Sequence, residues 1–260
     1  MQGSVGYNLT FAAAICLVCA VVVSSSAVSL KERQQRNAAV DKQRSVLLAA
    51  GLASDNEGLS ADEIATRFTP ITQVVVDLAS GEAAADVDPV GFDQRTAAND
   101  PARSRVAPEN ASRIMRLPNE ALVYEVRDVS GRLDMVVLPV EGLGLWGTLY
   151  GFVALDGDLR TIRGLTFYEH KETPGLGGEV DNPRWKALWV GRLAFDQTLT
   201  PVITVIKGLA GPVADDPYSV DGLSGATITS RGVTNLLRFW LGPDGFEPYL
   251  TWLRESERTN

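Results

Sequence analysis

The chain has 260 residues and is acidic, with 24 lysines and arginines against 32 aspartates and glutamates and a formal net charge of −8. Outside the N-terminal region the basic residues form no dense stripe, so nucleic acid is excluded as an expected partner. The length allows one soluble domain of ordinary size behind a single apolar N-terminal stretch.

An uncharged segment covers residues 9–30, and its centre is almost wholly apolar. About 22 helical residues, each rising ~1.5 Å, just cross the hydrocarbon core of a bilayer. A removable signal peptide is the alternative, with a small-residue cleavage region at residues 24–27. The stretch before the segment contains no lysine or arginine to form the charged start of a signal peptide. We therefore expect a short tail at residues 1–8 and a retained transmembrane helix at residues 9–30.

The charges on the two sides of this segment are unequal. Lys31, Arg33, Arg36, Lys42 and Arg44 follow it, whereas only the α-amino group precedes it. By the positive-inside rule, this distribution places the large domain in the cytoplasm.

Cys16 and Cys19 are the only cysteines, and their i, i+3 spacing puts them on one face of the apolar helix. A metal would need more ligands than the chain supplies, since the only histidine is His170. We therefore interpret both cysteines as small apolar residues of the membrane helix, with lipid modification as the alternative.

Residues 31–50 have the pattern of a mostly polar helix that ends near Gly51, which indicates a stalk. Residues 70–79 are typical of a strand. Residues 80–120 are rich in Ala, Asp, Asn, Pro and Arg, a composition that favours loops and short helices.

We group residues 31–120 as the stalk and an N-terminal elaboration, and residues 121–260 as the main domain. Strand-like apolar runs recur there at residues 121–127, 133–140, 148–155, 161–168 and 202–207. The dipeptide Asp156-Gly157 between two of these runs signals a hairpin. Helical patterns occupy residues 183–190, 230–241 and 247–255. These elements predict an α+β fold, a mainly antiparallel twisted sheet with packed helices, preceded by one N-terminal transmembrane helix.

Residues 221–230 read Asp-Gly-Leu-Ser-Gly-Ala-Thr-Ile-Thr-Ser and lead into an amphipathic helical pattern. The apolar stripe of that helix consists of Val233, Leu236, Leu237, Trp240 and Leu241. Unpaired N–H groups at a helix N-terminus and the helix dipole both favour an anion, and phosphate is the obvious candidate. A plain turn followed by an N-cap is the alternative.

A second loop, at residues 172–178, reads Glu-Thr-Pro-Gly-Leu-Gly-Gly. One proline and three glycines allow its backbone to lie flat against a ligand. A tight turn between a strand and Pro183 is the alternative that needs no ligand.

Together the two loops resemble the motifs of FMN-binding domains in membrane redox complexes. The run from Ser224 to Thr227 is similar to the flavinylation motif of that family, and residues 172–178 are similar to its second signature. The stretches at 142–146 and 150–151 and the N-terminal region also resemble the family. Over nearly the whole chain, the likeness is to the NqrC family of the sodium-translocating NADH:quinone oxidoreductase. The related RnfG family of the Rnf ferredoxin:NAD complex shares the flavin motifs and ranks second.

The resemblance implies that FMN is bound covalently through a phosphoester at Thr227. It implies phosphate binding by Ser224 and Thr229, and close approach of a modifying enzyme to the backbone at Gly225 and Ala226. From its place at the end of an apolar strand, Lys207 is a candidate to neutralise the phosphate, with a solvated surface lysine as the alternative. The second loop would form a wall against the flavin ring, with its N–H groups facing the ring heteroatoms. The residues assigned to that wall are Glu172, Thr173, Pro174, Gly175, Leu176, Gly177 and Gly178. We expect no role for His170, and we interpret the five tryptophans as packing residues, of which Trp146 is nearest the motifs.

The family further implies a separate flavin transferase that uses FAD, and other polypeptides of a membrane NADH:quinone reductase complex as partners. It places the large domain on the periplasmic side of the bacterial inner membrane, against the prediction from charge. A membrane-anchored binding or scaffold domain without flavin is the alternative from another class.

Overall fold

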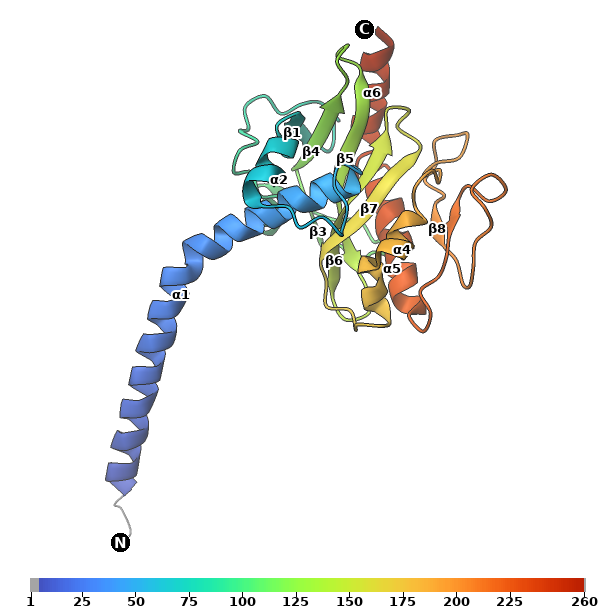
Figure 1. Cartoon of the computed structure of the whole chain (residues 1–260). Helices are drawn as coiled ribbons and strands as arrows, with labels where there is room; N and C mark the ends of the chain where they lie inside the picture. The colour runs from blue at the N-terminus through green and yellow to red at the C-terminus, as the bar shows by residue number, and fades with distance from the viewer. Residues whose placement is uncertain (1–4, 260) are drawn as a thin grey trace. The chain divides into compact units, whose positions relative to one another are not determined.

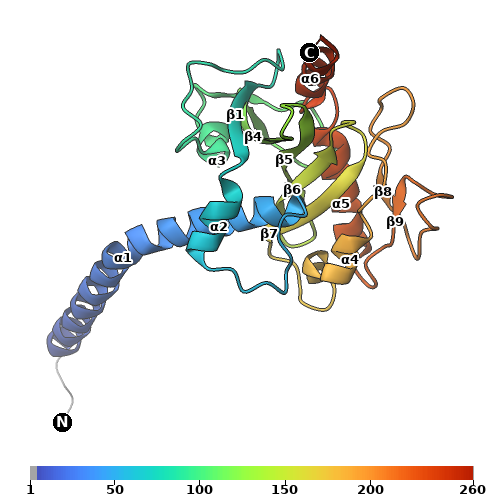
Figure 2. The same cartoon turned by 45° about the horizontal axis from the view of Figure 1, so that its top comes forward.

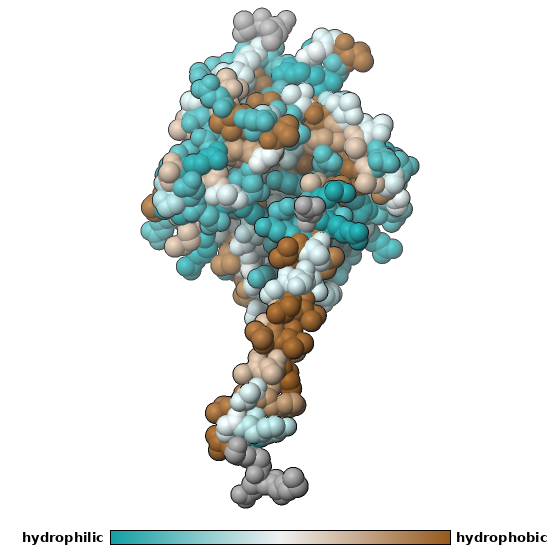
Figure 3. Space-filling model, turned by 90° about the vertical axis from the view of Figure 1, so that its left-hand side faces the viewer, coloured by the Kyte–Doolittle hydropathy of each residue, from teal (hydrophilic) through white to brown (hydrophobic). Residues whose placement is uncertain are grey.

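The computed structural model describes residues 5–259 and divides into two compact units, with the boundary between Lys42 and Gln43. The first unit is helical. Helix α1 spans Val5–Ala49, and its part Val5–Lys31 is long and apolar enough to cross a membrane, with none of its apolar window buried. Figure 3 shows the apolar side chains that cover this part of the helix. Exposure of so large an apolar surface to water is unfavourable, so this part of the helix is suited to a membrane anchor.

Helix α1 ends at Ala49, close to Gly51 as the sequence predicts. This glycine has a φ of +69°, and its N–H donates to Leu48 O at 3.1 Å. The N–H of Leu52 donates to Leu47 O at 2.9 Å, which completes a Schellman motif. The predicted stalk and the apolar segment are therefore one continuous helix.

The second unit is built on a five-stranded sheet in the order β1-β4-β5-β6-β7, with every neighbouring pair antiparallel (Figure 1). The strands are β1 (Ile71–Asp77), β4 (Glu120–Arg127), β5 (Leu133–Leu143), β6 (Thr148–Asp156) and β7 (Ile162–Glu169). The hairpin predicted at Gly157 joins β6 to β7. Because β1 pairs with β4 along its whole length, the N-terminal elaboration and the main domain share one sheet.

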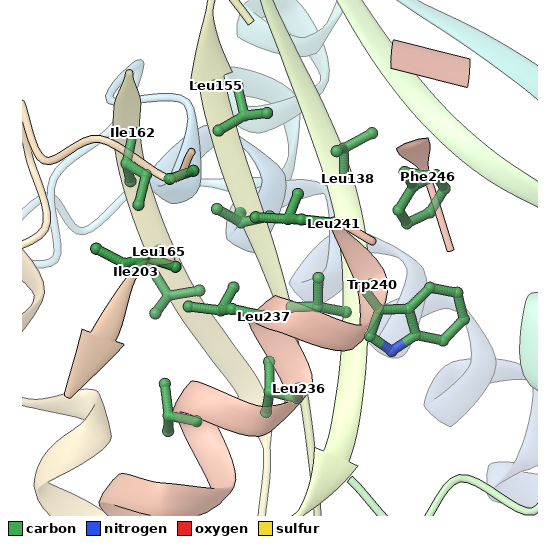
Figure 4. Packing of buried hydrophobic residues seen from close by; sticks show 14 of the residues in the cluster. Leu138, Leu155, Ile162, Leu165, Ile203, Leu236, Leu237, Trp240, Leu241 and Phe246 are labelled. Atoms are coloured by element: carbon green, nitrogen blue, oxygen red, sulfur yellow. The ribbon is translucent and has the colours of Figure 1, made fainter. Parts of the chain in front are cut away.

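Helix α5 (Thr227–Trp240) covers one face of the sheet and α6 (Glu247–Thr259) follows it. The stripe predicted on α5 is fully buried and packs on inward-facing residues of the strands (Figure 4). Alternation along β4 sends Val123 toward this helix and Tyr124 toward the opposite face. The α+β fold with packed helices is confirmed.

The opposite face of the sheet is covered by α2 (Ala61–Phe68), a helix that the sequence pattern did not predict (Figure 2). Its start is a capping box between Ser60 and Glu63, and its Phe68 ring meets Tyr124 edge-on at 5.9 Å. The last turn of α1 packs on the same sheet, where Gly164 leaves room for the backbone of Ala49.

Short elements complete the second unit. They are α3 (Gln94–Asn99), β2 (Ser104–Val106), β3 (Arg116–Pro118), η1 (Gly177–Asp181), α4 (Pro183–Ala187), β8 (Thr204–Val205) and β9 (Ser219–Val220). The strand predicted at 202–207 is only two residues long and pairs in parallel with β9, while the outward-facing Val205 N–H donates to the Thr234 side chain. The helix predicted at 183–190 ends at Ala187, before a turn at Gly191, whose φ is +81°.

Candidate functional site

The predicted phosphate loop leads directly into α5, which begins at Thr227, three residues earlier than predicted. Ala226 occupies the N-cap position, and no side chain there caps the helix. The interpretation of this loop as an ordinary N-cap therefore lacks its usual hydrogen bond. The Thr227 side chain is exposed at the N-terminus of a 14-residue helix, where the dipole favours negative charge.

Glu172 connects the two predicted loops. Its carboxylate is buried, and Oε1 accepts the N–H groups of Leu145 and Trp146, each at 2.9 Å. The other oxygen, Oε2, accepts the hydroxyl of Thr229 in α5. One side chain thus joins the β5–β6 turn, the second loop and the helix that carries Thr227.

Thr229 has a role other than the predicted phosphate contact. It is fully buried, and its hydroxyl donates to Glu172. The i, i+2 spacing from Thr227 explains the difference, because residues two apart point to different sides of a helix. Glu172 likewise serves as a buried link and does not form an open wall.

Glycines permit the close approach of these segments. A Cβ on Gly144 would lie 2.6 Å from Glu172 Oε1, and one on Gly177 would lie 2.6 Å from Thr229 Oγ1. A Cβ on Gly225, whose φ is +70°, would lie 2.9 Å from Leu176. The predicted loops are therefore in contact with each other.

The second loop is itself a tight turn, as its alternative interpretation proposed. Thr173 and Pro174 are exposed, and Gly175 has a φ of +75°. The N–H groups of Leu176 and Gly178 both donate to Thr173 O, at 3.1 and 2.9 Å. These two amides are used within the turn, and the contact of this loop with a flavin ring stays a prediction.

Four apolar side chains stand exposed around the Glu172 link. Leu145 and Trp146 follow β5, Leu176 lies in the second loop, and Ile228 follows Thr227. Trp146 is 65% exposed, which excludes the packing role that its residue type suggested. The sequence did not predict Leu145 and Ile228 as site residues, because the local sequence does not show whether an apolar side chain is exposed.

A cleft of about 570 Å³ opens beside Thr227. Ser224, Gly225 and Lys207 line it, which brings three of the predicted residues together with Thr227. Arg231, one helical turn after Thr227, adds a second basic side chain that was not predicted.

His170 is a further residue of the site that was missed. Its side chain is only 14% exposed; Nδ1 accepts the Glu172 N–H at 3.1 Å, and Nε2 lies 2.7 Å from Asp181 Oδ2. The hydrogen bond with Asp181 raises the pKa of His170, and partial burial opposes this rise. His170 therefore fixes the backbone of the residue that links the loops.

The antiparallel sheet and the two joined loops define the class of protein. Residues 144–242 match the model of the FMN-binding domain family, and this range includes both loops. The whole chain is 49% identical to the Na(+)-translocating NADH-quinone reductase protein NqrC of Pseudomonas aeruginosa over 98% of each chain. It is 44% identical to NqrC of Yersinia pestis, covering 99% of this chain and 96% of that one. The chain belongs to the NqrC family of Na(+)-translocating NADH-quinone reductase.

Solved structures agree. The NqrC structure of Shewanella oneidensis superposes with a TM-score of 0.76 at 36% identity, covering 86% of this chain and 99% of that one. The structure of the corresponding protein from Parabacteroides distasonis has a TM-score of 0.66 at 27% identity, with coverage of 85% and 97%. The resemblance to NqrC is confirmed and is favoured over the Rnf alternative.

Proposed function

We propose that this chain is the electron-transfer subunit of a membrane Na+-pumping NADH:quinone oxidoreductase and carries FMN covalently at Thr227. The observation that carries the proposal is the exposed Thr227 hydroxyl at the start of α5, beside a cleft with two basic side chains. Bound FMN would supply one-electron transfer, and the protein would fix its position and adjust its potential.

The phosphate fits this end of the site. Lys207 and Arg231 bring two positive charges to the cleft, and the N-terminus of α5 adds its dipole. Ser224 is exposed in the same loop and is placed to donate to a phosphate oxygen. The negative charge of a phosphodiester at Thr227 would thus be balanced by Lys207, by Arg231 and by the helix dipole.

The flat ring fits the other end. Exposed apolar side chains at Leu145, Trp146, Leu176 and Ile228 offer a surface of the kind that an isoalloxazine ring needs. The hydrogen bonds of Glu172 hold together the three segments that carry these side chains: the β5–β6 turn, the second loop and helix α5. The N–H groups of Leu176 and Gly178 are used within the second loop, so hydrogen bonds to the ring would come from its other amides.

Attachment requires help, because a threonine hydroxyl is a weak nucleophile. We infer a separate flavin transferase that uses FAD: the bond between Thr227 Oγ and phosphorus forms, the phosphoanhydride bond breaks and AMP leaves, while a base takes the hydroxyl proton. Gly225 is exposed and leaves the backbone open to such an enzyme, whereas Ala226 is buried and anchors the loop to the core.

In this proposal residues 9–30 span the bacterial inner membrane and residues 31–120 form the stalk and elaboration. Residues 121–260 form the FMN-binding domain, which lies on the periplasmic side and meets the other subunits of the complex. NADH oxidation would take place on another polypeptide of that complex.

The test is flavin fluorescence in a denaturing gel. Full-length chain produced together with a flavin transferase should give a fluorescent band that Thr227→Val abolishes. Thr251→Val is the matched control, because it removes an exposed threonine hydroxyl in α6, outside both loops, and should keep the band. An unlabelled wild-type chain, or a fluorescent Thr227→Val band, would overturn the assignment.

A further inference from the structure

A second cleft, of about 250 Å³, shares no lining residue with the one beside Thr227. It lies between α3, the chain that leads into β3, and the adjoining ends of β5 and β6. Its polar lining consists mainly of Arg95, Ser112, Arg113, Arg116, Glu141 and Tyr150. Nothing in the proposed flavin chemistry uses these residues.

The planar guanidinium group of Arg95 is held in one orientation by two contacts. Its guanidinium carbon lies 3.3 Å from the centroid of the Tyr150 ring, and Nη1 donates to Glu169 Oε2 at 2.8 Å. The other two nitrogens, Nε and Nη2, are buried and have no partner at hydrogen-bond geometry among residues 5–259, although the Tyr168 side chain lies close to the guanidinium and interacts with it electrostatically. These two nitrogens form the side-on edge of a guanidinium, the edge that binds a carboxylate with two parallel hydrogen bonds.

Ser112 presents a third unpartnered group in the same cleft. The residue is 1% exposed, and its Oγ has no partner among the described residues. Its carbonyl accepts the Leu143 N–H at 2.9 Å, which fixes the backbone beside β5. Buried polar atoms are nearly always hydrogen-bonded, so three such atoms around one cleft point to a ligand.

The charge of the cleft favours an anion. Arg113 and Arg116 add positive charge, although the Arg116 guanidinium is already bonded to Ser104. Glu141 is the only carboxylate that the described residues contribute to the lining. Burial raises the pKa of Glu141, with Arg95 acting in the opposite direction.

We propose that this cleft binds a small organic carboxylate, whose two oxygens pair with the guanidinium edge of Arg95 while Ser112 donates to one of them. A planar carboxylate matches a single guanidinium edge, whereas a phosphate dianion would bring more charge next to Glu141. The volume limits the ligand to a short mono- or dicarboxylate. The proposal concerns a site apart from Thr227, so its outcome is independent of flavin attachment.

The experiment is calorimetric titration of the full-length chain in detergent with sodium succinate, with sodium chloride at equal ionic strength as the blank. We expect saturable binding of one succinate, weakened about tenfold or more by Arg95→Gln and about threefold by Ser112→Ala. Arg103→Gln is the matched control, since that guanidinium lies over Phe92 outside the cleft, and it should bind as the wild type does.

Heat no greater than the chloride blank, or equal affinity in Arg95→Gln, would overturn the proposal. Inorganic phosphate is titrated in parallel, and tighter binding of phosphate than of succinate would also overturn it. If circular dichroism shows that Arg95→Gln is unfolded, Arg95→Lys decides the same question. It keeps the charge but lacks the two-nitrogen edge, and it should still lose about tenfold in affinity.

Discussion

Glu172 shows how one side chain can organise a site. Its carboxylate accepts three hydrogen bonds, from the N–H groups of Leu145 and Trp146 and from the Thr229 hydroxyl. Glu172→Ala leaves these donors without a partner, and we expect it to lower the free energy of unfolding by about 2–4 kcal/mol. Urea unfolding of the flavin-free protein measures the loss. Glu109→Ala, at an exposed glutamate, is the control and should stay within about 0.5 kcal/mol; a similarly small loss in Glu172→Ala would remove the linking role.

His170 adds a pH dependence at the same scale. Its pKa is raised above the ordinary 6.5 mainly by the hydrogen bond with Asp181. A raised folded-state pKa stabilises the protein fully below the unfolded pKa, and this gain is lost as pH rises through the raised value. The stability advantage of wild type over His170→Gln should therefore be larger near pH ~5 than near pH ~9, by less than about 1 kcal/mol. Asp181→Asn should remove the same dependence, and a constant difference across pH would contradict the assignment.

At the scale of elements, α5 is held to the β5–β6 turn by close backbone contact. A Cβ on Gly232 would lie 2.5 Å from Leu143 O and 3.2 Å from Gly144 Cα. Alanine favours a helix by about 1 kcal/mol over glycine, yet we expect Gly232→Ala to destabilise the protein by about 1–3 kcal/mol through this overlap. Gly58→Ala is the control, since nothing lies within 4 Å of its Cβ and its φ is not positive. Thermal unfolding measures the stability of both variants. A Gly232→Ala variant more stable than the wild type would show that α5 and the β5–β6 turn are not in close contact.

The elements also show what sequence alone can predict. The stripe from Val233 to Leu241 predicted the buried face of α5, because helical periodicity is local information. The bond between Glu172 and Thr229 joins residues 57 apart, so no local pattern could reveal it. The same holds for His170, whose partners depend on how the second loop turns. The site's loops were predicted through resemblance, whereas their hydrogen bonds required the fold.

At the scale of the whole molecule, the membrane orientation remains the sharpest conflict between charge and family. Lys31, Arg33 and Arg36 favour a cytoplasmic domain, whereas we propose a periplasmic one. A chain with Cys16 and Cys19 replaced by serine and a single cysteine at exposed position 54 reports the side directly. A membrane-impermeant maleimide should label it in intact spheroplasts. Labelling only after permeabilisation would place the domain in the cytoplasm, and a cysteine at position 109 provides a second reporter.

The most direct measurement is the mass of the proteolytic peptide that contains Thr227, taken from full-length chain matured with a flavin transferase. We expect this peptide to gain the mass of FMN less one water, with fragmentation locating the gain on the Thr227 hydroxyl. An unmodified peptide from matured protein, or a gain located on Ser224 or another residue, would contradict covalent attachment at Thr227.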